Sequence, residues 1–246
     1  MFYGFPMRKV PWWIVVPASA APVLLVGGWW VAQLLQGPRY DPVTTSISVL
    51  GAYGAPGYWV LTGALLALGA CYLAIAAGLR QAATAGRVAL GGGGAASLAL
   101  TLVPAPSSGG SLHHGAIAAV GFVLLALWPV FAAGRGDRAA PWALRPGPAA
   151  AASALMWVGA AWFWIELHRD GVPRLPGAAE RVVTLAQALW PLLVVLSCAR
   201  APRPYTAAGD GGREGGVRRT VRLGGSAHPP GADSSAPGRT RPSSRS

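Results

Sequence analysis

Residues 11–36 read PWWIVVPASAAPVLLVGGWWVAQLLQ, a stretch without a single charged side chain. A helix that crosses about 30 Å of hydrocarbon at about 1.5 Å per residue needs roughly 20 such residues. Tryptophan pairs, Trp12–Trp13 and Trp29–Trp30, lie near its two ends, as is typical of side chains at bilayer interfaces. The stretch therefore predicts a transmembrane helix. We expect it to remain uncleaved, because only a short apolar run precedes the signal-peptide-like Ala18–Ser19–Ala20.

Five further stretches of this kind follow. Of the 246 residues, 53% are hydrophobic and 11% charged, which excludes an ordinary soluble domain. The third stretch contains the glycine run Gly91–Gly94, which suits a helix only where neighbours pack against the bare backbone, and a re-entrant or broken segment is the alternative. We predict an all-α, six-helix transmembrane bundle over residues 1–199. Its helices cover about residues 11–36, 57–79, 88–104, 112–133, 148–167 and 182–199.

The 20 Lys and Arg residues indicate how the chain is threaded. With the N-terminus inside, only Arg39, Arg169, Arg174 and Arg181 face outward, which leaves 16 of the 20 on the cytoplasmic side. Positive charge favours the cytoplasm, so we predict a cell-membrane protein with both termini cytoplasmic. Residues 200–246 are rich in Gly, Pro, Ser and Arg and predict a disordered basic tail that favours anionic lipid headgroups. No nucleic-acid partner is expected, despite the net charge of +12.

Under this topology, side chains capable of chemistry gather at the extracytoplasmic ends of the helices. The Asp41–Pro42 pair predicts a capped interfacial helix of about nine residues that ends near Gly51. Ser111 is a candidate N-cap for the fourth long helix, whose first turn then holds His113 and His114. Adjacent residues point about 100° apart on a helix, so we expect at most one of the two histidines to face the bundle interior.

Three sets of candidate site residues follow from this arrangement. The catalytic candidates are His113, His114, Glu180 and Ser48. The ligand-binding candidates are Asp41, Ser46, Ser48, Glu166 and Arg181. The candidates for a divalent metal, which the imidazoles and carboxylates would suit, are His113, His114, His168 and Asp170. No other cofactor is indicated, and two cysteines are too few for a disulfide framework or a four-thiolate zinc site.

Two functions of different class remain open. The first is a membrane protein that binds a lipid headgroup, a small ligand or a membrane partner at its extracytoplasmic rim. The second is a hydrolase of a lipid-like substrate at that rim, with His113 or His114 as base or metal ligand and with Glu166 and Glu180 assisting. For the acids, simple surface ion pairs with the outward-facing arginines, together with helix capping, are the structural alternative.

Three short motifs carry a resemblance to a known family. They are TTSISVLGAYG at residues 44–54, HHGAIAAVGF at residues 113–122 and PGAAERV at residues 176–182. On these motifs the chain resembles the bacterial membrane-protein family catalogued as domain of unknown function 998, over about residues 11–199. The resemblance implies a six-helix scaffold with three recurring elements. Their matching positions here are Ser48, Leu50 and Gly51, then His113 or His114, then Gly177, Glu180 and Arg181.

Overall fold

The computed structural model describes residues 10–106, 110–134, 140–171 and 174–201. In these ranges the chain forms seven α-helices and one short 3-10 helix, with no β-strand. The tail expected to be disordered lies outside the described ranges from residue 202 onward, as do residues 1–9. The helices are α1 (Trp12–Leu34), α2 (Ile47–Leu50), α3 (Tyr58–Gly78), α4 (Thr84–Leu102), α5 (Leu112–Ala132), η1 (Trp142–Leu144), α6 (Pro146–His168) and α7 (Pro176–Arg200).

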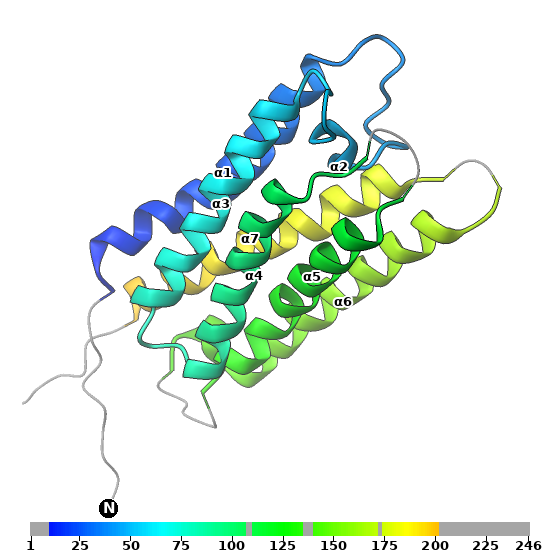
Figure 1. Cartoon of the computed structure of the whole chain (residues 1–246). Coiled ribbons are helices and arrows are strands. Elements are labelled where there is room, and N and C mark those ends of the chain that lie inside the picture. The colour runs from blue at the N-terminus through cyan, green and yellow to red at the C-terminus, as the bar shows by residue number, and fades with distance from the viewer. Residues whose placement is uncertain (1–9, 107–109, 135–139, 172–173, 202–246) are drawn as a thin grey trace, which may run out of the picture. The chain divides into compact units, whose positions relative to one another are not determined.

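The six long helices form a closed ring. Each contacts the next along the chain, and α7 also contacts α1. Because the helices alternate in direction, the start of α1 and the end of α7 lie at the same end of the bundle (Figure 1). Large side chains such as Tyr72, Trp128 and Val194 are buried in the core between the helices. The all-α bundle expected from the sequence is therefore confirmed.

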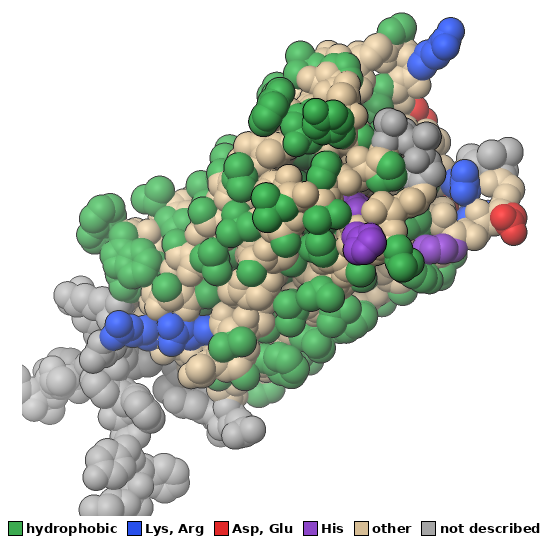
Figure 2. All heavy atoms as spheres, in the orientation of Figure 1, with side chains coloured by type: hydrophobic (Ala, Val, Ile, Leu, Met, Phe, Trp, Pro, Cys, Tyr) green, Lys and Arg blue, Asp and Glu red, His purple; other side chains and the backbone are tan. Residues whose placement is uncertain are grey.

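The sides of the bundle are apolar. Large hydrophobic side chains such as Trp59, Val158 and Trp164 are exposed there. Figure 2 shows hydrophobic side chains spread over the sides, with Lys, Arg, Asp and Glu gathered toward the two ends. Five of the described helices, namely α1, α3, α5, α6 and α7, are long and apolar enough to cross a membrane. The chain is a multi-pass membrane protein, because several long helices carry apolar surface that is unfavourable in water and favourable in lipid.

Helix α4 differs from the other long helices. It has 19 residues, but its glycine run and Arg87 make it less apolar than the five candidate spans. It is nevertheless one continuous helix, not a broken one. A Cβ added at Gly94 would lie 2.9 Å from the carbonyl oxygen of Gly69 in α3, and a Cβ added at Gly93 would lie 2.5 Å from a methyl carbon of Leu125 in α5. The bare backbone thus lets α4 pack closely between its two neighbours.

Three predicted helix boundaries change. Helix α7 begins at Pro176 rather than at residue 182, because proline suits the first position of a helix and needs no N–H there. Helix α4 begins at Thr84 rather than at residue 88. Its Arg87 donates to the carbonyls of Ala76 and Ala77 at 2.6 and 2.9 Å, so the arginine caps the end of α3 instead of stopping α4. The third change is in the short helix of the loop after α1, which belongs to the candidate site.

Candidate functional site

The loop between α1 and α3 begins with a turn that Asp41 stabilises. One carboxylate oxygen accepts a hydrogen bond from the Val43 backbone N–H and the other from the Thr44 hydroxyl, each at 2.9 Å. These bonds, the backbone one foremost, hold the pKa of Asp41 below its usual value. The prediction of a nine-residue helix capped by Asp41 is wrong, because the turn already uses this carboxylate. Helix α2 is four residues long, and its cap is Ser46.

Glu180 of α7 is the centre of the polar cluster. Its side chain is 5% exposed, although its carboxylate has no ion pair with any Lys or Arg in the described ranges. Its Oε2 accepts hydrogen bonds from the Ser46 hydroxyl and the Ile47 backbone N–H, both at 2.6 Å. Its Oε1 lies 3.4 Å from the Ser48 hydroxyl. A buried carboxylate in an apolar bundle requires such donors, and the first residues of α2 and its cap Ser46 supply them.

His114 completes the cluster from the first turn of α5. Its Nδ1 lies 2.8 Å from the Val103 carbonyl oxygen and its Nε2 lies 3.2 Å from Ser48 Oγ. A carbonyl can only accept, so Nδ1 carries a hydrogen, and in the neutral tautomer with this hydrogen Nε2 is an acceptor. Ser111 caps α5 as expected, since its Oγ accepts from the His114 N–H at 3.3 Å. His113, next to it, is exposed.

Arg181 binds the same loop from the other side. Its Nη1 donates to the carbonyls of Pro42, Thr45 and Gly177 at 2.6, 3.1 and 3.0 Å. Its Nη2 donates to the Tyr40 hydroxyl at 2.7 Å. The interpretation of Arg181 as a partner of surface acids is therefore wrong, because its two terminal nitrogens donate to backbone carbonyls and to the Tyr40 hydroxyl. Burial raises the pKa of Tyr40, and the neighbouring guanidinium opposes that shift.

The loop lies very close to the start of α7. The Ala178 N–H donates to the Val43 carbonyl at 3.0 Å. A Cβ at Gly177 would overlap the carbonyls of Pro42 and Thr45, so only glycine allows this approach. The guanidinium of Arg181 also lies 5.1 Å from the ring centroid of Trp29 in α1. The first turns of α7 thus fix the position of the whole segment that carries Ser46 and Ser48.

A pocket of about 110 Å³ lies inside the ring, with this cluster at one end. Its polar end is formed by Ser48, His114 and Glu180. Apolar side chains form most of its walls, with contributions from α1, α3, α4 and α5: Leu25, Leu61, Leu65, Leu100, Ala118 and Phe122. A pocket with apolar walls and a few convergent polar groups is the usual form of a small-molecule site.

A family model described as "Protein of unknown function (DUF998)" matches residues 19–197, from α1 to the last turns of α7. The chain belongs to the DUF998 family. The resemblance that the three sequence motifs suggested is thereby confirmed. No curated protein and no solved structure matches the chain. Every residue of the polar cluster lies inside the matched range.

The structure brings together some of the predicted site residues of this DUF998 protein and separates others. Ser46, Ser48, His114 and Glu180 meet in one cluster. His168 instead lies against the ring of Trp164, with centroids 4.0 Å apart. Asp170 is exposed beyond the end of α6. In the part of the chain that the structure describes, no three His, Cys, Asp or Glu side chains are grouped so that they could hold a metal ion.

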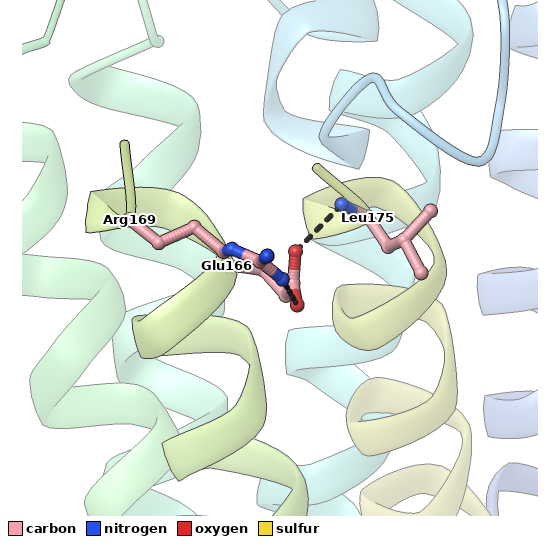
Figure 3. Close-up of polar contacts among 3 residues, drawn as sticks. All are labelled: Glu166, Arg169 and Leu175. Carbon is pink, nitrogen blue, oxygen red and sulfur yellow. Dashed lines mark hydrogen bonds and ion pairs between the residues drawn. The ribbon is translucent and has the colours of Figure 1, made fainter. Parts of the chain in front are cut away.

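Glu166 stabilises a separate contact between α6 and α7. It is 5% exposed, and its Oε1 accepts from Arg169 Nη1 at 3.1 Å. Its Oε2 accepts from the backbone N–H of Leu175, the residue before α7, at 2.8 Å. Figure 3 shows the carboxylate between these two donors. The ion pair with Arg169 expected from the sequence is present, and Glu166 here joins two helix ends instead of entering the polar cluster.

Sequence reasoning missed several functional positions. Tyr40 and Val103 hold Arg181 and His114 in place, and Thr184 and Gln187 line the pocket below Glu180. The spacing of Glu180, Thr184 and Gln187 places them on one helix face and was a usable signal. No sequence feature predicts the role of the Val103 carbonyl, because any residue type supplies a carbonyl.

We expect Arg181→Lys to destabilise the protein, because a lysine cannot reproduce four hydrogen bonds from one planar group. The expected loss in unfolding free energy is about 2 kcal/mol, measured by thermal unfolding in detergent. Arg169→Lys is the matched control: Arg169 is half exposed and a lysine keeps its charge next to Glu166, so stability should change by less than about 0.5 kcal/mol. Equal effects of the two substitutions would contradict this account of Arg181.

Proposed function

We propose that this DUF998 protein binds an amphipathic, lipid-like molecule in its pocket, with the polar head at Ser48, His114 and Glu180. One observation carries the proposal: three polar side chains from three different helices converge at the end of an otherwise apolar pocket. The volume of about 110 Å³ suits a head group with the first few carbons of a chain. Burial of those carbons would contribute about 0.8 kcal/mol for each methylene group.

The proposal places the pocket near the extracytoplasmic side of a cell membrane. It takes α4 as a sixth span, because α4 lies in the ring between α3 and α5 and connects them in alternating directions. Six spans agree with the common end at which α1 begins and α7 finishes (Figure 1). Under the positive-inside rule that end is cytoplasmic, so the polar cluster lies at the opposite, outer end.

The pocket itself is tested by filling it. Ala118 lines the pocket, whereas its neighbour Ala119 is exposed on the outer face of α5. In phosphatidylcholine nanodiscs, we expect Ala118→Leu to weaken binding of octan-1-ol about tenfold, and Ala119→Leu to leave it unchanged. Titration calorimetry, corrected with empty nanodiscs, measures both. If octan-1-ol does not bind the wild-type protein, or binds the two variants equally, the proposed function is refuted.

The orientation is tested by cysteine labelling in a background that lacks Cys71 and Cys198. Tyr53, which is 77% exposed after α2, should react as Tyr53→Cys with an impermeant maleimide added to intact cells. The exposed Arg80, between α3 and α4, should react as Arg80→Cys only after the membrane is opened. The reverse pattern would contradict the proposed topology and would place the polar cluster on the cytoplasmic side.

A second candidate function, hydrolysis of a lipid-like ester, is favoured by one contact. Ser48 Oγ lies 3.2 Å from His114 Nε2, a distance at which an imidazole can act as base for a serine nucleophile. The groups around Ser48 favour ligand binding over hydrolysis. The N–H groups of Ile47 and Ser48 are already used, and the Glu180 carboxylate beside Ser48 would oppose a developing oxyanion.

An alkyl fluorophosphonate separates the two functions. The hydrolase predicts a covalent adduct on Ser48 that mass spectrometry detects in the wild-type protein and not in Ser48→Ala. The binding function predicts no adduct in either, together with retained binding of octan-1-ol. An adduct on Ser48 would make the hydrolase the better account.

A further inference from the structure

The charged side chains that line the pocket indicate which head groups it can bind. Among the described side chains that line it, Glu180 is the one acid, and there is no lysine or arginine. Arg181, the next residue, does not line the pocket. Its two terminal nitrogens donate to Pro42, Thr45, Gly177 and Tyr40, so this charge is directed at the loop. An anionic head group would therefore meet a carboxylate with no lysine or arginine in the lining to compensate it.

The polar end has more acceptors than hydrogens. Glu180 Oε2 accepts two short hydrogen bonds, but Oε1 has only the 3.4 Å contact with Ser48. His114 Nε2 is the other group within reach of the Ser48 hydroxyl. Ser48 has one hydrogen and cannot donate it to both. One acceptor at the end of the pocket is therefore free for a donor from the ligand.

Five hydroxyl groups line the pocket further along, those of Thr62, Tyr72, Ser97, Thr101 and Thr184, and three of them already donate within their own helices. Ser97 donates to the carbonyl of Gly93 at 3.2 Å, and Thr101 donates to the carbonyl of Leu98 at 2.7 Å. Thr184 donates to the backbone carbonyl of Glu180 at 2.7 Å. Each of these hydrogens is used within its own helix. Their oxygens retain lone pairs, so these positions too can accept from a ligand.

We propose that the pocket selects amphiphiles whose head donates hydrogen bonds, preferring an ammonium head to a hydroxyl head and rejecting a carboxylate or phosphate head. This statement rests on the proposed binding function and names its ligand class. The Glu180 carboxylate supplies the preference for positive charge, and the free acceptor supplies the preference for a donor. Long-chain amines and alcohols fit this class, whereas fatty acids and anionic phospholipids do not.

Three probes with the same chain test the proposal: octylamine, octan-1-ol and octanoate at pH 7.4. Titration calorimetry in phosphatidylcholine nanodiscs, corrected with empty nanodiscs, gives the three dissociation constants. We expect octylamine to bind the wild-type protein at least about tenfold more tightly than octanoate, with octan-1-ol between them. Glu180→Gln should weaken octylamine about tenfold and change octan-1-ol by less than about threefold. The matched control is Asp170→Asn, an exposed carboxylate beyond the end of α6 that does not line the pocket, which should change none of the three.

The outcomes distinguish the two proposals. If none of the probes binds, the proposed function fails. If all three bind equally and Ala118→Leu weakens all of them, the pocket binds amphiphiles but the selection by head group is overturned. Octylamine selectivity that persists in Glu180→Gln would likewise overturn it. If Glu180→Gln does not fold, the ratio of octylamine to octanoate affinity in the wild-type protein still decides the matter.

Discussion

The burial of one carboxylate organises the outer end of this bundle. Glu180 is almost completely removed from solvent and must find donors, since an unpaired buried charge costs several kcal/mol. The donors come from Ser46 and Ile47, more than 130 residues earlier in the chain. To supply them, the loop after α1 must lie across the first turns of α7. The contact between α1 and α7 that closes the ring is thus stabilised by polar groups at one end and by apolar packing along the rest.

The same constraint shapes the site. Arg181 and Gly177 allow the loop to approach α7 closely, and this approach places Ser48 between Glu180 and His114. Packing of α4 through its glycines brings the end of that helix, with the Val103 carbonyl, against the imidazole. The pocket is the space below these groups, closed at its polar end by a hydrogen-bonded cluster. Stability and binding therefore depend on the same residues, so substitutions here need matched controls.

Much of the fold could be predicted from the sequence, because the length of each uncharged, apolar stretch determines where a membrane-spanning helix forms. Uncharged stretches of about 20 residues identified the six long helices, and the glycine run predicted close packing of α4. The predicted helix boundaries were wrong where polar residues have distant partners. Glu180 and Arg181 lie inside α7, because the loop after α1 and the start of α2 satisfy their hydrogen bonds. Ser48, His114 and Glu180 were recognisable one by one as candidates, but their convergence depends on contacts between distant segments, which one sequence does not reveal. Glu166 has the same chemistry and a different role, which only the position of Leu175 decides.

A double-mutant cycle between Ser46 and Glu180 tests the central claim most directly. The unfolding free energies of the wild-type protein, Ser46→Ala, Glu180→Gln and the double variant are measured in one detergent. If the buried carboxylate is held by this loop, the two substitutions are coupled by about 1–3 kcal/mol, because Ser46→Ala removes the hydroxyl that donates to Glu180 and Glu180→Gln removes the charge that strengthens this hydrogen bond. Additive effects, within about 0.5 kcal/mol, would contradict the account and would mean that the loop does not depend on Glu180.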